Sequence, residues 1–141
     1  MAFEELKNKI AIVGVGYTAQ GKIEGRTAVS FHCEAIRNAL ADAGIEKQDI
    51  DALLLYRHFD AIGGDYDVTA FTVAEQLGIR PAVVSQETYC TRSWLYYCIG
   101  LLETGLAKYI VCPTVTTAAA GSGTGRGLAG ASSGRCCVMG I

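Results

Sequence analysis

The chain has 141 residues, half of them hydrophobic and only 18% charged, which fits one folded domain and excludes a disordered chain. Twelve Lys and Arg residues against 14 Asp and Glu give a net charge of −2, and no basic cluster is present, so we expect no nucleic-acid partner. No apolar run approaches the roughly 20 residues that span a bilayer, and the N-terminus carries no secretory signal. We therefore expect a cytoplasmic protein without a membrane span.

Apolar runs alternate with segments of helical spacing along most of the chain. The runs that predict buried strands are 10–15, 51–56, 82–85 and 109–115. The segments that predict helices are 26–43, 68–77 and 93–104, each followed by a glycine (Gly44, Gly78 and Gly105) that favours a helix end. This alternation predicts an α/β fold with a mostly parallel sheet and helices on both faces.

The third predicted helix differs from the first two. Between Trp94 and Leu102 its apolar residues lie on every side and not along one stripe. Such a helix is normally enclosed by protein. We therefore expect a central buried helix, covered in part by a partner subunit or by further sequence.

The sequence after residue 117 is rich in glycine and shows no strand or helix period. This composition is typical of a flexible segment. We therefore divide the chain into a domain over residues 1–117 and a glycine-rich tail over 118–141, flexible or truncated. We expect residues 121–141 to add no strand to the sheet.

The segment from Gly14 to Ala19 fits the glycine pattern of a dinucleotide-binding turn. That site requires a helix to begin directly at the glycines, so that its N-terminus meets the pyrophosphate. Here the helical spacing begins only after Gly25. We therefore favour a turn at the end of the first strand over a nucleotide site.

Six cysteines are present, but none forms a CxxC pair and none has a histidine at zinc-finger spacing, so we expect no metal site. Cys33, Cys98 and Cys112 lie in apolar segments and read as packed thiols. Cys90 lies just before the third predicted helix, with Arg92 close by, and both features favour the thiolate.

His58 follows the second strand at the same predicted edge of the sheet, so Cys90 and His58 are candidates for a nucleophile and a base. The alternative is an unreactive turn cysteine and a surface histidine. His32 lies within the first helix and reads as a packing residue.

Several blocks between residues 8 and 117 resemble the N-terminal half of the thiolase superfamily, most closely the sterol-carrier/lipid-transfer thiolase-like branch. The blocks are KIAIVGVGYTAQGK, EAIRNALADAGIEKQDIDALLLY, AEQLGI and LETGLAKYIVCPTV. The resemblance implies strand order 3-2-1-4-5 with the third helix at the centre. It also implies an acyltransferase of lipid metabolism that makes or breaks C–C bonds on coenzyme A thioesters, with no tightly bound cofactor.

The resemblance also implies a nucleophilic cysteine at the start of the third helix. Counting back from Gly105 without gaps places Thr88 at that position, and Cys90 lies two residues later. The chain has no counterpart of the family's second half, so we expect it to be an incomplete catalyst.

Two alternatives stay open. One is a nonthiolase retro-aldol lyase-type subunit that works with an OB-fold partner; the other is a catalytically inactive half-domain or pairing module. The expected partners are acyl-CoA and a second subunit, in a homodimer paired along residues 82–87 or in a heteromer with a thiolase-like or OB-fold chain.

Overall fold

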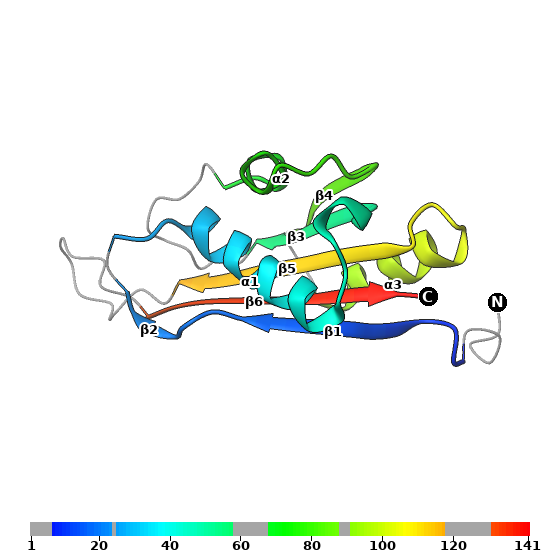
Figure 1. Ribbon diagram of the computed structural model, residues 1–141, viewed down its shortest axis with the longest axis horizontal. Helices are drawn as coiled ribbons and strands as arrows, with labels where there is room; N and C mark the ends of the chain where they lie inside the picture. The colour runs from blue at the N-terminus through cyan, green and yellow to red at the C-terminus, as the bar shows by residue number, and fades with distance from the viewer. Residues whose placement is uncertain (1–6, 24, 58–67, 88–90, 118–130) are drawn as a thin grey trace.

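The computed structural model describes residues 7–23, 25–57, 68–87, 91–117 and 131–141. These residues form three layers, with α1 and α2 on one face of a sheet and α3 on the other (Figure 1). The helices are α1 (Ala28–Ala43), α2 (Ala70–Leu77) and α3 (Thr91–Glu103), with a short 3-10 helix η2 (Lys47–Asp49). The strands are β1 (Ala11–Tyr17), β2 (Gly21–Lys22), β3 (Ala52–Arg57), β4 (Val83–Glu87), β5 (Tyr109–Thr117) and β6 (Ala131–Gly140).

The main strands lie in the order β1-β6-β5-β3-β4, and β2 pairs with the start of β6. β3 is parallel to both β4 and β5, whereas β6 is antiparallel to β5 and to β1. β1, β3, β4 and β5 therefore run in one direction and β6 runs against them. This arrangement confirms the predicted α/β fold with a mostly parallel sheet.

The prediction that residues 121–141 add no strand to the sheet is wrong for residues 131–140. They form β6, which is hydrogen-bonded on both sides and fills the space between β1 and β5. Its small residues suit this position, because a Cβ at Gly134 would come within 2.8 Å of the carbonyl oxygen of Phe31 in α1. Residues 118–130 lie outside the described part of the chain.

The expected strand order 3-2-1-4-5 is also wrong. With the two-residue β2 left out, the observed order is 3-2-4-5-1. The physical reason is β6: it provides the partner that β1 needs, so β1 lies at the edge of the sheet and β5 takes the place beside β3.

Local signals define the helix ends. The Thr27 side chain accepts a hydrogen bond from the backbone N–H of Ser30 at the start of α1, and Thr69 forms a capping box with Thr72 at the start of α2. α1 and α2 end at Gly44 and Gly78, which have φ angles of 66° and 67°. The left-handed conformation favours glycine, which confirms both predicted ends.

Gly14 and Gly16 lie within β1 and not in a turn, so the predicted turn at this position is wrong. Both glycines allow α1 to approach the strand closely. A Cβ at Gly16 would overlap the backbone of Ala35 and Ala39, and one at Gly14 would lie 2.7 Å from the Cβ of Ala43. α1 begins only at Ala28, so its N-terminus does not meet these glycines as a dinucleotide site requires.

Two hydrophobic cores lie on the two faces of the sheet. The larger joins α1 and α2 to residues such as Leu53, Leu55 and Val138. The smaller forms where Cys98, Leu101 and Leu102 of α3 pack on the other face. Within the described part of the chain, the outer side of α3 is open to solvent, because Leu95, Tyr96 and Tyr97 are 40%, 61% and 43% exposed.

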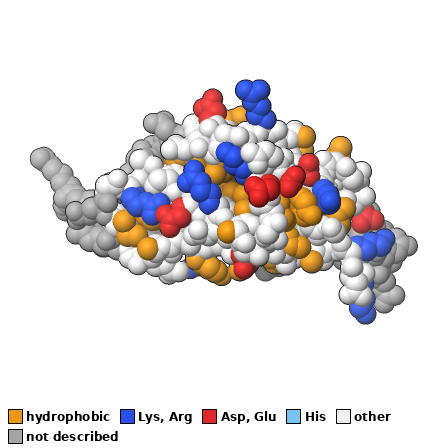
Figure 2. All heavy atoms as spheres, in the orientation of Figure 1, with side chains coloured by type: hydrophobic (Ala, Val, Ile, Leu, Met, Phe, Trp, Pro, Cys, Tyr) orange, Lys and Arg blue, Asp and Glu red, His pale blue; other side chains and the backbone are white. Residues whose placement is uncertain are grey.

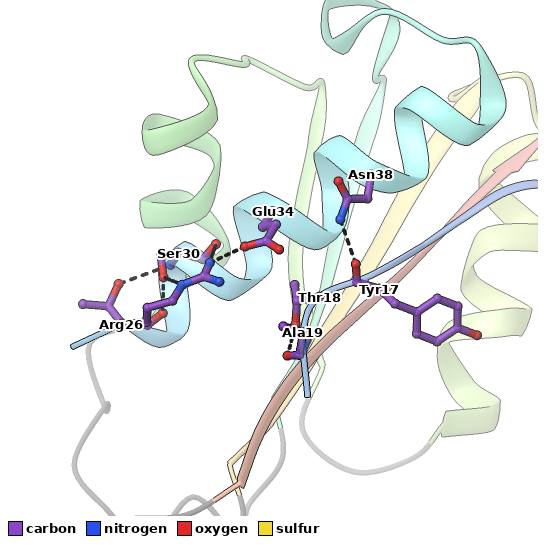
Figure 3. Close-up of polar contacts among 9 residues, drawn as sticks. Tyr17, Thr18, Ala19, Arg26, Ser30, Glu34 and Asn38 are labelled. Carbon is purple, nitrogen blue, oxygen red and sulfur yellow. Dashed lines mark hydrogen bonds and ion pairs between the residues drawn. The ribbon is translucent and has the colours of Figure 1, made fainter. Parts of the chain in front are cut away.

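The two edges of the sheet differ. At the β1 edge, side chains from α1 bond the strand's backbone: the N–H of Val15 donates to Asp42, and the Asn38 amide donates to the carbonyl oxygen of Tyr17 (Figure 3). These bonds satisfy groups that would otherwise invite another strand. β4 forms the opposite edge.

The face shown in Figure 2 carries Lys and Arg side chains interspersed with Asp and Glu, so neither sign of charge dominates it. Within the described residues, no helix has both the length and the apolar character that crossing a membrane requires.

Candidate functional site

A pocket of about 190 Å³ opens on the α3 side of the sheet, beside the helix. β1, β3, β5, β6 and α3 all contribute to its walls. The lining residues are Val15, Tyr17, Leu54, Tyr56, Trp94, Cys112, Thr114, Arg135, Cys136 and Cys137.

Strand register explains why residues so distant in sequence meet here. Tyr17 is the Cα partner of Arg135, Arg135 of Thr114, and Thr114 of Tyr56, so these four residues form one row across four strands. The next row places Val15 opposite Cys137 and Cys137 opposite Cys112. Because side chains alternate along a strand, residues in the two rows point to the same face.

The pocket is apolar with a cationic margin. Three aromatic side chains, Tyr17, Tyr56 and Trp94, contribute to its walls. Figure 3 shows the Tyr17 ring directed away from α1, across β1. Arg135 is exposed at the rim, so the site offers an apolar interior and one guanidinium group.

Three thiols, those of Cys98, Cys112 and Cys137, lie together beside the pocket, and the last two line it. The sulfur atoms of Cys98 and Cys112 lie 3.5 Å apart. A hydrogen bond from the Cys112 thiol lowers the pKa of Cys137, whereas hydrogen bonds to Cys137 and Cys98, together with burial, raise the pKa of Cys112 well above its usual value. Cys137 is therefore the member of this cluster that most readily loses its proton.

The cysteine next to it behaves differently. Although Cys136 borders the pocket, it is only 5% exposed and belongs to the core on the opposite face, where burial raises its pKa well above the usual value. Within the part of the chain that is described, no group of three or more His, Cys, Asp or Glu residues is arranged to hold a metal ion.

The candidate residues from the sequence, Cys90, Thr88 and His58, lie outside the described residues. The elements that flank them are described: β3 ends at Arg57, β4 ends at Glu87 and α3 begins at Thr91. Tyr56 and Glu87 are Cα partners in the parallel pair, so β3 and β4 have their C-terminal ends at the same end of the sheet.

His32 is the packing residue that the sequence predicted. It is 4% exposed, and burial lowers its pKa to about 4. Its Nδ1 atom has no hydrogen-bond partner among the described residues, so His32 is neutral at physiological pH.

Sequence reasoning missed Tyr17, Arg135 and Cys137. Arg135 and Cys137 lie in the segment that was read as a tail, and only its pairing with β1 and β5 brings them to the pocket. The short apolar run from Cys136 to Met139 was the available signal, but the preceding glycine and serine residues obscured it.

Solved structures with the same architecture include OleA from Xanthomonas campestris, crystallised with lauric acid and lauroyl-CoA. It aligns with a TM-score of 0.71 and 14% identity over 94% of this chain and 56% of its own. 3-Oxoacyl-(acyl carrier protein) synthase III from Xanthomonas oryzae aligns with a TM-score of 0.70, also at 14% identity, over 94% of this chain and 56% of its own. The chain has a thiolase-like fold.

A third match is the Ltp2-ChsH2(DUF35) aldolase, with a TM-score of 0.65 and 26% identity over 82% of this chain and 30% of that one. Two curated proteins are each 41% identical over 51 residues. They are the steroid side-chain-cleaving aldolase of Thermomonospora curvata and the 17-hydroxy-3-oxo-4-pregnene-20-carboxyl-CoA lyase of Mycobacterium tuberculosis.

These 51 residues are 36% of this chain and 13% of either curated protein. The thiolase-like chain thus spans only a part of the proteins that it matches. No protein-family model matches it.

Proposed function

We propose that this chain binds a coenzyme A thioester and holds its acyl group in the pocket beside α3, as one part of a thiolase-like assembly that makes or breaks C–C bonds. The observation that carries the proposal is the apolar pocket, lined by Tyr17, Tyr56 and Trp94, on a thiolase-like fold. An acyl chain is the apolar part of such a substrate, and its transfer from water into this pocket is favourable.

Two features fit a thioester better than a purely apolar ligand. Arg135 at the rim offers its guanidinium group to an anion such as a phosphate of coenzyme A. The pocket volume of about 190 Å³ is below the roughly 300–1,000 Å³ of complete small-molecule sites. The pocket therefore accommodates one portion of a larger ligand.

In this proposal Cys90 is the acyl acceptor, with His58 as a candidate base. Cys90 immediately precedes α3, and the N-terminus of a helix stabilises a thiolate. Thr88 is the alternative position for the nucleophile in the gapless register, and a threonine there points to a chain that binds the thioester without accepting its acyl group.

Trp94 provides a direct test of binding, because it is the only tryptophan in the sequence and it lines the pocket. We expect its fluorescence to change on titration with a medium-chain acyl-CoA and to change much less with coenzyme A alone. Val15→Glu should weaken binding, because it places a charge at the apolar wall.

Ile12→Glu is the matched control, since Ile12 lies on the same strand and is exposed but does not line the pocket. Equal binding by Val15→Glu and the unmodified protein, or no response to acyl-CoA, would contradict the proposal. Labelling of Cys90 by acetyl-CoA, followed by intact mass, tests its role as acceptor.

A second candidate function is a retro-aldol lyase-type subunit, favoured by the 41% identity to a steroid side-chain-cleaving aldolase and to a lyase. In this case Cys90 is incidental, the partner is a small OB-fold chain, and Cys90→Ala keeps full activity of the assembled complex. Copurification with an OB-fold protein supports this candidate. Acyl-CoA binding with no turnover in either assembly supports an inactive half-domain or pairing module instead.

The proposed assembly is a dimer or a heteromer in the cytoplasm. The edge strand β4 and the exposed side chains Leu95, Tyr96 and Tyr97 are the surfaces that a second subunit would cover. Sedimentation at low micromolar concentration tests this: a single monomeric species that binds no hydrophobic dye would contradict it.

A further inference from the structure

We propose that Cys137 and Cys112 form a redox-active dithiol at the floor of the pocket, a modification site that reacts with a hydroperoxide and closes to a disulfide between β5 and β6. The inference rests on the three-thiol cluster and is independent of the coenzyme A proposal.

The backbone already holds the two residues at disulfide spacing. Cys112 and Cys137 are direct Cα partners in the antiparallel β5·β6 pair. Directly opposed residues in such a pair have Cα atoms about 4.5–5.5 Å apart, within the range of about 4.4–6.8 Å found for disulfides. Both side chains line the pocket and are half-buried, so the two thiols lie on the same face of the sheet, as a disulfide between directly paired strand residues requires.

Accessibility and acidity identify Cys137 as the thiol that reacts first. It lines the pocket, and its hydrogen bond from Cys112 lowers its pKa, so it carries more thiolate than an ordinary thiol. Cys98 also touches Cys112, with 3.5 Å between the sulfur atoms, but it is 0% exposed and no oxidant reaches it from solvent. Cys136 packs on the other face of the sheet.

The chemistry proceeds in two balanced steps. The Cys137 thiolate attacks one oxygen of the hydroperoxide; an S–O bond forms, the O–O bond breaks, and an alcohol or water leaves after taking up a proton. The Cys112 thiol then attacks the sulfur of the Cys137 sulfenic acid; an S–S bond forms, the S–O bond breaks, and water leaves. The protein loses two hydrogen atoms, and a dithiol reductant restores them.

Trypsin resolves the product, because the thiols in question fall on separate peptides. Cleavage after Arg92, Lys108, Arg126 and Arg135 places Cys98 on 93–108, Cys112 on 109–126, and Cys136 with Cys137 on 136–141. The reduced protein is treated with hydrogen peroxide, its remaining thiols are blocked with N-ethylmaleimide, and the digest is analysed without reduction. We expect 109–126 linked to 136–141 as the main product, and loss of that link after dithiothreitol.

Variants assign the link to one atom pair. Cys137→Ser should abolish it, whereas Cys136→Ala and Cys98→Ala should keep it. The same reaction in denaturant controls for fold, since an unfolded chain distributes its disulfides among all six cysteines. A main product that joins 93–108 to 109–126, a link that survives in Cys137→Ser, or full alkylation of Cys112 and Cys137 after peroxide treatment would each overturn the proposal.

Discussion

Thr18 and Gly134 exchange two hydrogen bonds across a sequence separation of 116 residues. The N–H of Gly134 donates to the Thr18 hydroxyl at 2.8 Å, and the N–H of Thr18 donates to the carbonyl oxygen of Gly134 at 3.0 Å. The pair joins the end of β1 to β6 beneath α1. It thereby fixes the register of the strand that places Arg135 and Cys137 at the pocket.

We expect Thr18→Val to lower the free energy of unfolding by about 1–3 kcal/mol, because it leaves the buried N–H of Gly134 without its acceptor. Thr18→Ser keeps the hydroxyl and should cost less. Urea denaturation of the three proteins measures the difference. Equal midpoints for Thr18→Val and the unmodified chain would show that this bond does not stabilise the fold.

The close approach of α1 to β1 predicts a large effect of one methyl group. Gly16→Ala should destabilise the protein by about 1–3 kcal/mol or more, because its Cβ overlaps the backbone of Ala35 and Ala39. Gly100→Ala adds the same group in α3, where nothing lies within 4 Å, and should be neutral or stabilise the helix by up to about 1 kcal/mol. Thermal melting compares the two variants. The glycine contact would be unimportant if Gly16→Ala melted at the temperature of Gly100→Ala.

Burial of His32 predicts a loss of stability in mild acid. Its pKa is about 4 in the folded state against 6.5 for an exposed histidine, so below pH 6.5 the unfolded chain binds a proton that the folded chain does not. The full pKa difference between the folded and unfolded states is equivalent to about 3 kcal/mol of unfolding free energy. About 2 kcal/mol of this stability is lost as the pH falls from about 7 to 5.

Denaturation midpoints for the unmodified protein and His32→Gln across this range provide the measurement. The pH dependence should flatten in His32→Gln, whatever its absolute stability. His58→Gln removes the other histidine of the sequence and should keep the slope. A slope that survives in His32→Gln would assign the effect to another group.

The hydrogen bonds of Asp51 predict that its side chain stabilises the fold. Its carboxylate accepts hydrogen bonds from the N–H groups of Lys108 (2.7 Å) and Tyr109 (3.0 Å) and so ties the start of β3 to the start of β5. Asp51→Ala should cost about 1–2 kcal/mol of unfolding free energy, and Asp51→Asn less because it keeps an acceptor. Asp49→Ala, an exposed neighbour in η2, is the control and should change stability little. Equal losses of unfolding free energy in Asp49→Ala and Asp51→Ala would contradict a stabilising role for the Asp51 carboxylate.

The sequence predicts the helices well because their signals are local. Thr27 and Gly44 bound α1, Thr69 and Gly78 bound α2, and each makes its bonds to residues a few positions away. β6 was missed because its evidence is distant: Gly134 is suited to its place only because Phe31 and Thr18 press against it. Glycine in isolation indicates flexibility, whereas glycine between two packed elements indicates a lack of space.

The candidate site likewise combines residues with local sequence signals and residues that only distant strand pairing brings together. Cys112 reads as a packed thiol in the sequence, and the structure places it beside both Cys98 and Cys137. That cluster depends on strand register, which no local pattern encodes. The candidates Cys90, Thr88 and His58 depend on the resemblance and on their places beside strand ends, and they stay predictions.

The place of β6 in the sheet has a consequence for how the protein is made. Among the described strands, β1 pairs only with β6, so β1 (Ala11–Tyr17) leaves the ribosome long before residues 131–140 are made and can serve as its backbone partner. Until then its N–H and C=O groups and the exposed side chains of Val13 and Val15 face solvent. Long-range pairing of this kind slows folding and lengthens the time during which a nascent chain can aggregate. The demand for a chaperone should therefore fall most heavily on the N-terminal strand, well before the pocket exists.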